Sequence, residues 1–366
     1  MTATVAHKVA LAGGGTGGHV TPALALADAF AADGAQVLFI GTPQGLEATL
    51  VPKRGYPIEL VPGSRLVGGG IGTKVRGLRH LASGILAARK ILQEQQIALV
   101  VGVGGYASGA ALLAARTLGI PTAIHESNAV PGLTNRVLGH LVDRVYLGFA
   151  AASNDFDRER TVVSGNPVRR EIAAVAAGRK PRENRPAHVL IVGGSQGSEF
   201  LNTRVPPLLA RVAQAGQSLE VRHQVGKLDP APVTAAYAEL GLPVRVETFI
   251  DDMADAYAWA DVAITRSGSG TVAELAAAGL PALLVPFPHA AGDHQAANAK
   301  AFADAGAGWW QRQETWNESD AAARIGGLLA DARSWRETSN AAHAFGAADA
   351  AGAIAADCAS WMEGRW

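Results

Sequence analysis

The sequence predicts an α/β protein built from two doubly wound, Rossmann-like domains, and three observations lead to this fold class. Short apolar runs alternate along the whole chain with alanine-rich stretches typical of helices. Several of these runs end in a glycine- or serine-rich loop that opens a helix, which is the βα unit of a parallel sheet. The length of 366 residues also exceeds what one hydrophobic core commonly supports, so two domains are expected.

The first half of the chain predicts a sheet with right-handed crossovers, because strands and helices alternate throughout it. Its strands are expected near residues 8–12, 36–40, 58–61, 97–103, 121–125, 144–147 and 161–163. The alternation breaks at Gly165-Asn166-Pro167, and an alanine-rich, then charged stretch with two further prolines follows. We therefore assign residues 1–164 to an N-terminal domain and 165–186 to a linker.

The second half restarts the same pattern. Its strands are expected near residues 188–192, 220–224, 244–248, 261–265 and 282–285. This alternation assigns residues 187–345 to a C-terminal domain of the same doubly wound type. Residues 346–366 are predicted to form a C-terminal helix, and its packing partner stays open, with a return to the N-terminal domain as one option.

Bulk properties exclude several classes of protein. The 32 Lys and Arg residues balance the 32 Asp and Glu residues, so no overall field selects nucleic acid. The single cysteine, Cys358, excludes an intrachain disulfide and a cysteine-based metal site, and it fits a reducing compartment. The start of the chain lacks the features of a secretory signal. The uncharged stretch 97–115 contains four glycines and is better explained as strand, loop and helix than as a membrane span.

The glycine loop of residues 13–18 is the first candidate ligand site. It follows a strand and precedes a helix expected from about Pro22, so its amides and the helix dipole offer a seat for a phosphate. It matches the dinucleotide fingerprint, but the acidic residue expected at the end of the second strand is missing. Variant loops recur at residues 104–109, 193–198 and 266–271. For the 104–109 loop, a simple tight turn is an equally good interpretation.

His19 and Glu126 are the candidate catalytic residues. His19 lies at a helix start, where the positive dipole end disfavours imidazolium, so it is a candidate general base. Binding a phosphate or the backbone is an equally weighted role for it. Glu126, in the strand-end motif His125-Glu126-Ser127-Asn128, is expected to act as a base or to orient His19, and Asn128 to read sugar hydroxyls or amides. The motif has no second histidine four residues on, so we expect no metal site.

Four further positions suit parts of a sugar nucleotide. Arg169, beyond the Asn-Pro break, is placed to clamp a pyrophosphate, with a surface salt bridge as the alternative. Ser195 offers a hydroxyl within a glycine loop. Glu274, one turn into a helix, would repel phosphate but suits two ribose hydroxyls, unless it only satisfies the helix dipole. Gln295 lies on one helix face with Asn298, and such amides suit sugar hydroxyls.

A basic, amphipathic region spans residues 64–92. It holds seven Arg, Lys and His residues and no acid, interleaved with Leu, Ile and Val. Such a stretch predicts contact with an anionic membrane surface. The alternative is an ordinary domain helix with a solvated basic face. Nucleic acid is disfavoured because the stretch contains no aromatic residue.

Together these motifs resemble the MurG family, glycosyltransferases of family 28, over essentially the whole chain. The most specific pieces are GGGTGGHVTPALALA from Gly13, HESNAVPGLTNR from His125, GNPVR from Gly165, GGSQGS from Gly193, FIDDMADAYAWADVAITRSGSGTVAE from Phe249 and LPALLVPFP from Leu280. The resemblance implies a GT-B fold, in which two Rossmann-like domains face across a cleft. It also implies inversion at the anomeric carbon, no cofactor and no essential metal.

The resemblance further implies the substrates. The enzyme would move N-acetylglucosamine from UDP-N-acetylglucosamine (UDP-GlcNAc) to the 4-hydroxyl of lipid I, undecaprenyl-pyrophosphoryl-N-acetylmuramoyl-pentapeptide, giving lipid II. It would work peripherally at the cytoplasmic face of the inner membrane, in peptidoglycan synthesis. Carried over motif by motif, the donor contacts would be Thr16, Gly17, Gly18, Asn128, Arg169, Ser195, Ile250, Ser269, Gly270, Thr271, Val272, Ala273, Glu274 and Gln295. The family motif is less even after Pro288, so the register of residues 289–295 is open.

Three other functions stay open at this point. A UDP-sugar 2-epimerase uses the same kind of fold, but the basic apolar stretch favours a lipid acceptor. A nicotinamide dehydrogenase is disfavoured by the missing ribose acid after the second strand. A non-catalytic nucleotide-binding module is disfavoured by the pairing of His19 with Glu126.

Overall fold

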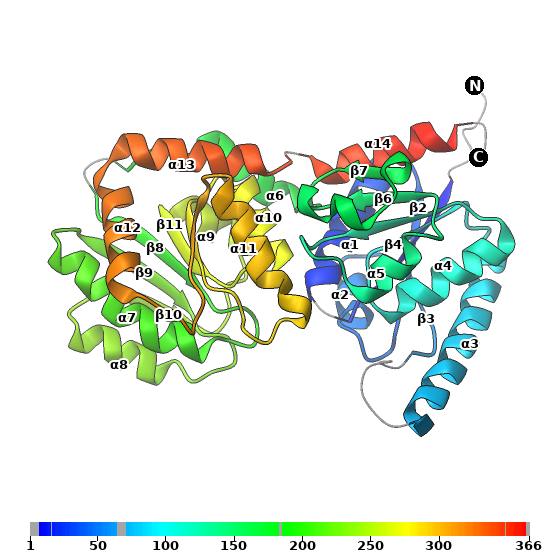
Figure 1. Ribbon diagram of the computed structural model, residues 1–366, viewed down its shortest axis with the longest axis horizontal. Helices are drawn as coiled ribbons and strands as arrows, with labels where there is room; N and C mark the ends of the chain where they lie inside the picture. Colours follow the sequence, from blue (N-terminus) through cyan, green and yellow to red (C-terminus); the bar gives the residue numbers. More distant parts are fainter. Residues whose placement is uncertain (1–6, 16, 64–70, 183–184, 348, 364–366) are drawn as a thin grey trace. The chain divides into compact units, whose positions relative to one another are not determined.

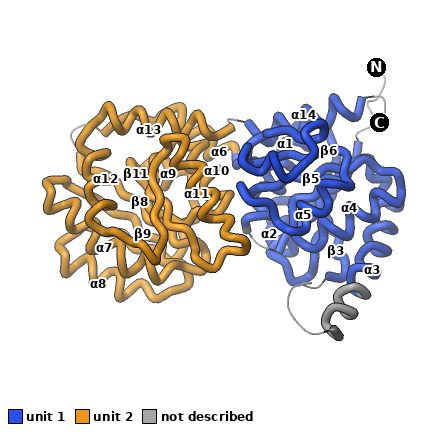
Figure 2. Tube along the Cα trace, in the orientation of Figure 1, with its two compact units in different colours: residues 1–169, 349–366 blue, residues 170–348 orange. Residues whose placement is uncertain are grey.

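The computed structural model describes residues 7–15, 17–63, 71–182, 185–347 and 349–363; side chains at 71–79 are outside that description. The chain divides into two compact units, which Figure 2 shows in different colours. Unit 1 comprises residues 1–169 and 349–366, and unit 2 comprises residues 170–348. The predicted class, α/β with two doubly wound domains, is confirmed.

Unit 1 is built on a parallel seven-stranded sheet with the order β3-β2-β1-β4-β5-β6-β7 (Figure 1). The strands are β1 (Lys8–Ala12), β2 (Gln36–Gly41), β3 (Ile58–Leu60), β4 (Leu99–Gly102), β5 (Thr122–Glu126), β6 (Arg144–Leu147) and β7 (Thr161–Val163). The helices are α1 (Gly17–Ala32), α2 (Glu47–Lys53), α3 (Ile71–Glu94), α4 (Tyr106–Leu118), α5 (Leu133–Leu138) and α14 (Ala350–Met362), with 3-10 turns η1 (Ala150–Asp155) and η2 (Arg158–Arg160). The strand order reverses between β1 and β4, and this switch point is where such sheets bind ligands.

Both faces of this sheet are covered, as expected for a parallel sheet. Successive residues of β1 point to opposite faces, so Val9 and Leu11 join one apolar cluster while Ala10 and Ala12 join another. The C-terminal helix α14 packs against α1 in the first cluster (Figure 1). The buried Tyr146 hydroxyl also donates a 2.8 Å hydrogen bond to the Asp357 carboxylate. The structure therefore places the C-terminal helix in unit 1.

Unit 2 repeats the architecture with a parallel six-stranded sheet of order β10-β9-β8-β11-β12-β13. Its strands are β8 (Ala187–Val192), β9 (Leu219–Gln224), β10 (Val244–Glu247), β11 (Val262–Thr265), β12 (Ala282–Leu284) and β13 (Gly308–Trp310). Its helices are α6 (Arg170–Ala173), α7 (Glu199–Gln214), α8 (Ala231–Glu239), α9 (Met253–Trp259), α10 (Ser269–Ala277), α11 (His294–Asp304), α12 (Glu318–Ala330) and α13 (Ala332–Phe345), with 3-10 turns η3 (Ala174–Gly178) and η4 (Ala291–Asp293). The switch point lies between β8 and β11.

The structure differs from the sequence-based expectation at the join between the domains. The expected linker covered residues 165–186, whereas the units meet between residues 169 and 170. The following segment is held in unit 2 by the mostly buried Arg179, whose guanidinium donates hydrogen bonds to the carbonyls of Tyr257, Ala260 and Ala278. These contacts join residues roughly 80 to 100 positions apart, so the local composition gave no sign of them.

Candidate active site and family assignment

The loops after β1 and β4 meet at the switch point of unit 1. Ala12 pairs in register with Gly102, so the two loops start side by side. The Gly14 N–H then donates to the Gly104 carbonyl at 3.3 Å. A Cβ on Gly13, whose φ is +148°, would lie 2.5 Å from that same carbonyl oxygen. Glycine is required here because the two backbones approach too closely for a side chain.

A cavity of about 630 Å³ opens at this switch point. It is lined by loops that follow β1, β2, β3 and β4, and by the first turns of α1, α2 and α4. Its lining residues are Gly14, Gly15, His19, Thr42, Gln44, Gly45, Glu47, Gly63, Gly105, Tyr106 and Ala107. The Tyr106 hydroxyl is buried and has no hydrogen-bond partner in the part of the chain that the structure describes. The cavity thus combines a histidine, a carboxylate, hydroxyls and exposed backbone.

His19 lies in the first turn of α1, because this helix begins at Gly17 rather than near Pro22 as expected. Its Nδ1 is 3.1 Å from the Gly14 carbonyl oxygen. A carbonyl oxygen can only accept, so Nδ1 carries the hydrogen of the neutral ring. Nε2 is then the nitrogen with the lone pair. His19 therefore has the tautomer that a general base on the cavity wall requires.

Glu47 is a functional candidate that the sequence reasoning missed. Its side chain is only 2% exposed at the start of α2, beneath the first glycine loop. One carboxylate oxygen accepts the Gly15 N–H at 2.7 Å. The other accepts the Thr42 N–H at 2.9 Å and the Thr42 hydroxyl at 3.0 Å. One amide of the loop expected to bind a phosphate therefore already donates to the buried Glu47 carboxylate.

Glu126 is buried at the end of β5 and organises the loop that follows. One of its oxygens accepts the Asn128 N–H at 2.8 Å and the Asn128 amide at 3.2 Å. The other accepts the Gly132 N–H and the Asn135 amide, each at 3.0 Å. None of these hydrogen bonds within the described residues goes to His19. The arrangement favours a loop-holding role for Glu126 over proton transfer.

His125, next to Glu126, joins two of the sequence motifs. Its Nε2 donates to the Gly165 carbonyl at 3.3 Å, and the Asn166 amide donates to the Ser127 carbonyl at 3.0 Å. Burial lowers the pKa of His125 to about 4, although its hydrogen bond to the Gly165 carbonyl opposes the shift. These contacts bring the segment that ends in the half-buried Arg169 to the carboxyl ends of β5 and β6.

In unit 2 the corresponding loops follow β8 and β11. Val192 pairs in register with Thr265, so the loops 193–198 and 266–271 start side by side. The glycine loop is held by the buried Gln224, whose side-chain oxygen accepts the Gly194 N–H at 3.1 Å. Its side-chain nitrogen donates back to the Gly194 carbonyl at 3.3 Å. Ser195 is exposed at the tip of this loop.

Arg266 supplies a positive charge at this switch point. Its guanidinium donates to the Ser198 hydroxyl at 2.7 Å and to the carbonyls of Val285 and Pro286 at 3.1 Å each. Burial lowers its pKa to about 10, so it remains charged at neutral pH. The adjacent helix α10 begins after Gly268, which has no side chain to cap it. Because no side chain in the described part of the chain caps this helix start, its first-turn amides suit an anion.

The other predicted residues of unit 2 lie on segments that follow β10, β11 and β12 of the same sheet. The half-buried Glu274 accepts a hydrogen bond from the Tyr257 hydroxyl at 3.0 Å. The Gln295 side chain accepts the Phe287 N–H at 3.0 Å, and its carbonyl accepts the Ser267 hydroxyl at 2.8 Å. Ile250, Ser269 and Val272 are buried, whereas Gly270, Thr271 and Ala273 are partly exposed.

The predicted residues thus fall in both units. Unit 1 holds Gly17, Gly18, His19, Glu126, Asn128 and Arg169. Thr16 lies outside the described residues. Unit 2 holds Ser195, Ile250, Ser269, Gly270, Thr271, Val272, Ala273, Glu274 and Gln295. Each group gathers at loops that follow the carboxyl ends of parallel strands.

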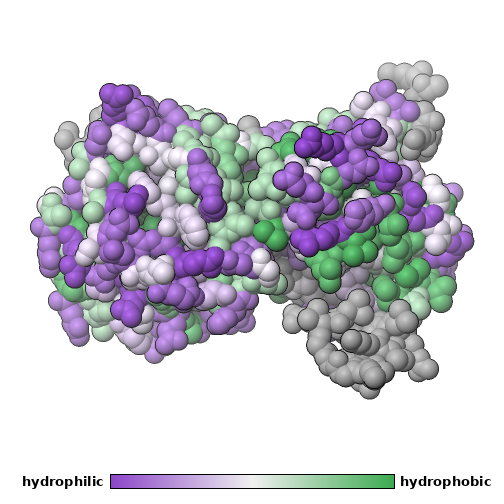
Figure 3. Space-filling model, viewed as in Figure 1, coloured by the Kyte–Doolittle hydropathy of each residue, from purple (hydrophilic) through white to green (hydrophobic). Residues whose placement is uncertain are grey.

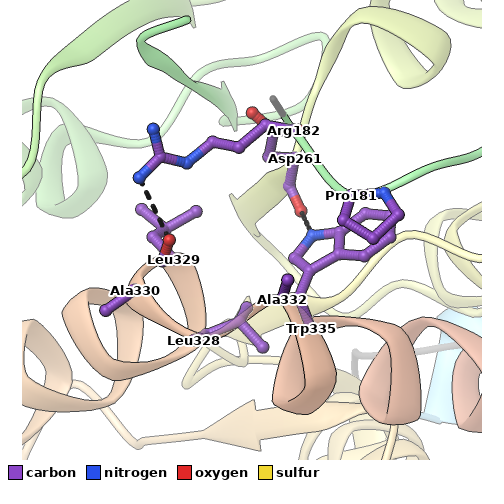
Figure 4. Close-up of a pocket in the computed structure, with 8 residues that line it drawn as sticks. All are labelled: Pro181, Arg182, Asp261, Leu328, Leu329, Ala330, Ala332 and Trp335. Atoms are coloured by element: carbon purple, nitrogen blue, oxygen red, sulfur yellow. Dashed lines mark hydrogen bonds between the residues drawn. The ribbon is translucent and has the colours of Figure 1, made fainter. Parts of the chain in front are cut away.

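A smaller cavity of about 310 Å³ lies at the opposite edge of the unit 2 sheet, beside the start of β11 (Figure 4). Polar groups that line it already form hydrogen bonds with one another. The Trp335 indole donates to the Asp261 carbonyl at 2.8 Å, and Arg182 donates to the Leu329 carbonyl at 3.1 Å. It contains none of the predicted residues.

No group of His, Cys, Asp and Glu side chains among the described residues is arranged to hold a metal ion. No helix in the described part of the chain is long and apolar enough to cross a membrane.

Known proteins are similar to this chain in sequence and in fold. Residues 9–147 match the glycosyltransferase family 28 N-terminal domain, and residues 188–354 match the family 28 C-terminal domain. A relative from Geobacter metallireducens is 40% identical over 95% of this chain and 96% of its own. One from Acidithiobacillus ferrooxidans is 43% identical over 97% of this chain and 98% of its own. Both are named UDP-N-acetylglucosamine--N-acetylmuramyl-(pentapeptide) pyrophosphoryl-undecaprenol N-acetylglucosamine transferase.

Solved structures agree. Acinetobacter baumannii MurG matches with a TM-score of 0.79 and 34% identity over 95% of this chain and 98% of its own. A UDP-N-acetylglucosamine 2-epimerase structure from Listeria monocytogenes matches with a TM-score of 0.65 over 98% of this chain and 97% of its own, at 15% identity, which shows the fold alone. The matched domains, the relatives and the two-unit architecture give the same assignment: the chain belongs to glycosyltransferase family 28 and has the GT-B type of α/β fold.

Proposed function

We propose that this protein transfers N-acetylglucosamine from UDP-GlcNAc to the 4-hydroxyl of lipid I and so makes lipid II for peptidoglycan. The names of relatives at 40% and 43% identity support this donor and this acceptor. The observation that carries the proposal in the structure is the set of anion-binding features at the switch point of unit 2. An uncapped helix start, a glycine loop and the Arg266 guanidinium lie together there.

These features suit the diphosphate of UDP. The first-turn amides of α10 and the hydroxyl of Ser195 would bind its oxygens, with Arg169 as a further cationic contact. The Glu274 carboxylate, one turn into α10, suits ribose hydroxyls because it accepts hydrogen bonds and repels phosphate. The backbone at Ile250 would read the base, and Gln295 the sugar. Thr16, Gly17, Gly18 and Asn128 complete the proposed donor contacts by family resemblance.

The proposed reaction is a single displacement with inversion. The 4-hydroxyl oxygen of the acceptor attacks the anomeric carbon, the bond from that carbon to the UDP oxygen breaks, and UDP leaves. His19 takes the hydroxyl proton on Nε2, since Nδ1 already carries a hydrogen toward Gly14. The amides of α10 stabilise the negative charge that develops on the departing UDP. Glu126 keeps the loop of Asn128 in place.

The test is sugar transfer by the purified chain. UDP-GlcNAc and a lipid I analogue are incubated with it, and UDP release, the disaccharide product and its anomeric configuration are followed. Acceptor-dependent formation of the β-linked product supports the proposal. Epimerised sugar or UDP release without acceptor would instead support the 2-epimerase alternative, and UDP binding without any reaction would support a nucleotide-binding module.

We also propose that unit 1 contacts the cytoplasmic surface of the membrane. The basic region 64–92 is the sequence argument, although residues 64–70 and the side chains at 71–79 lie outside the described part of the chain. Among described residues, Leu133, Val137 and Leu141 are 78%, 55% and 42% exposed at helical spacing on and after α5. Figure 3 shows apolar side chains gathered over this part of unit 1. Exposed apolar groups beside basic ones suit an anionic lipid surface.

Vesicle flotation tests this second proposal. The protein should float with vesicles that contain anionic lipid, and salt should release it because the attraction is screened. Leu133→Ser with Val137→Ser should weaken flotation without changing UDP binding. Equal flotation with purely neutral vesicles would contradict an electrostatic contribution, and no flotation with either would refute the contact.

A further inference from the structure

The buried Glu47 carboxylate has no role in the binding or catalysis proposed above. It lies against the first glycine loop so closely that a Cβ on Gly14 would come within 2.1 Å of its carboxyl group, and one on Gly45 within 2.0 Å. A carboxylate is rarely so buried unless donors surround it. Here three donors, from Gly15 and Thr42, converge on its two oxygens. Two loops that follow different strands, β1 and β2, are thereby tied together.

A continuous chain of contacts leads from Glu47 to His19. The carboxylate accepts a hydrogen bond from the Gly15 N–H. Gly15 follows Gly14, whose φ of +146° sets the direction of the backbone there. The Gly14 carbonyl in turn accepts from Nδ1 of His19. That last hydrogen bond decides which ring nitrogen keeps a lone pair. The orientation of the Gly14–Gly15 backbone therefore links the carboxylate to the tautomer of the histidine.

We propose that Glu47 is a positioning residue for His19: it fixes the glycine loop so that the Gly14 carbonyl holds Nδ1 and leaves Nε2 as the base. The catalytic part of this inference rests on the proposed function, while the hydrogen-bond chain does not. Glu47 does not touch the reacting atoms and acts only through the loop. Glutamine cannot replace it, because its NH₂ group would face an N–H or O–H donor.

The experiment compares Glu47→Gln with wild type and with Glu94→Gln, an equivalent change on the exposed end of α3. Transfer kinetics are measured with UDP-GlcNAc and a lipid I analogue. We expect kcat to fall roughly 10- to 100-fold in Glu47→Gln, as for displaced catalytic groups in general. The KM for UDP-GlcNAc should change less than kcat, because most of the proposed donor contacts, including those to the base and the ribose, lie in unit 2 and not on the loop that Glu47 holds. Glu94→Gln should match wild type in both constants.

A second measurement reports on the histidine directly. In protein with ¹⁵N-labelled histidine, long-range ¹H–¹⁵N spectra at about pH 8 distinguish Nδ1–H from Nε2–H in the neutral ring. The His19 signals are assigned by their loss in His19→Gln. Wild type should show the Nδ1–H form, and Glu47→Gln should show a mixture. A general loss of stability would not change the tautomer of a ring in the folded protein.

The outcomes separate the possibilities. An unchanged tautomer in Glu47→Gln overturns the inference, whatever happens to kcat, and an altered tautomer with unchanged kcat overturns its catalytic part. If Glu47→Gln does not fold, Thr42→Val removes only one of the three donors and should give a smaller shift in the same direction. If wild type transfers no sugar, the proposed function fails, yet the spectra still decide whether Glu47 sets the tautomer.

Discussion

The two units share one strand order around their switch points but place opposite charges there. In unit 1 the side chain that holds the glycine loop is a carboxylate, Glu47, which accepts the Gly15 N–H. In unit 2 the corresponding side chain is the neutral amide of Gln224, and the Arg266 guanidinium donates to the Ser198 hydroxyl of the same loop. The backbone architecture is the same, whereas the electrostatics differ.

This difference teaches how one fold serves two kinds of ligand. The topology decides where a ligand lies, because parallel strands gather their loops at one edge. Side chains from neighbouring strands then decide which charge that place accepts. A diphosphate suits unit 2, where Arg266 and the start of α10 attract it. Hydroxyl chemistry suits unit 1, where Glu47 disfavours an anion and His19 offers a base.

Acid should destabilise both units, and unit 2 more strongly. Each sheet buries a neutral histidine, and burial lowers the pKa of His223 to about 3 and that of His125 to about 4. The unfolded chain binds these protons near pH 6.5, so the stabilisation is complete above that pH and is lost as the pH falls toward 3 or 4. The expected losses are about 5 kcal/mol for His223 and about 3 kcal/mol for His125.

Urea unfolding at a series of pH values measures this effect. His223→Gln and His125→Gln should each be less stable at neutral pH but lose less on acidification than wild type. Ser360→Ala, an exposed change on α14 that removes no titratable group, provides the control and should keep the wild-type pH dependence. If the unfolding free energy of wild type and of His223→Gln fell equally with decreasing pH, protonation of His223 would not be the cause of the acid destabilisation.

The two glycine loops should respond differently to one added methyl group. In Gly14→Ala the new Cβ would lie 2.1 Å from the Glu47 carboxyl carbon at a φ of +146°, so the carboxylate must leave its three donors. We expect a loss of roughly 3 kcal/mol or more in unfolding free energy. Gly194→Ala has a φ of +83° but no heavy atom within 4 Å of the new Cβ, so only backbone strain of about 1–2 kcal/mol is expected.

Thermal unfolding and kinetics of both alanine variants give the measurement. Gly14→Ala should also lose kcat because it displaces the loop that holds His19, whereas Gly194→Ala should affect the KM for UDP-GlcNAc more than kcat because its loop carries the proposed diphosphate contact Ser195. Equal losses of unfolding free energy in the two variants would contradict the expectation that an added Cβ meets the Glu47 side chain at Gly14 but open space at Gly194.

Removing the Arg266 charge should weaken UDP binding. Arg266→Gln loses a cation and its hydrogen bonds to Ser198, Val285 and Pro286, which connect three loops at the switch point. We expect UDP affinity to fall about 30-fold, or about 2 kcal/mol, in titration calorimetry. Arg333→Gln, at a side chain that is 86% exposed, is the matched control. Wild-type affinity in Arg266→Gln would place the diphosphate elsewhere.

Much of this architecture followed from local sequence pattern. Buried strands appear as runs of Val, Ile and Leu, and glycine loops mark their carboxyl ends, so the strands around both switch points were predictable. The strand β13 was missed because it has three residues, two of them tryptophans, and no such run. The start of α1 was placed too late because its first two residues are glycines, which usually mark a loop.

The residues that give each switch point its charge were harder to predict, since their partners are distant in sequence. Glu47 holds an amide 32 positions away, and Arg266 bonds a hydroxyl 68 positions away. Nothing in the sequence around Glu47 distinguishes it from a surface helix residue. A useful signal would have been that three glycines, Gly14, Gly41 and Gly45, are needed to make room for it. The roles of the predicted donor residues remain predictions for binding experiments.

The smallest expected effect concerns the Ser195 hydroxyl. It lies exposed on the loop that Gln224 holds, so its contact with a phosphate oxygen would form in competition with water. Ser195→Ala should weaken UDP binding by about 0.5–1 kcal/mol, or two- to fivefold, and Ser360→Ala on α14 should have no effect. Calorimetry at several salt concentrations separates the contribution of the Arg266 charge to UDP binding from that of the Ser195 hydroxyl. The loss from Arg266→Gln should shrink as salt rises, because it removes a charge, whereas that from Ser195→Ala should not. If both losses depended equally on salt, Ser195 would be acting through the position of Arg266 and not through its own hydroxyl.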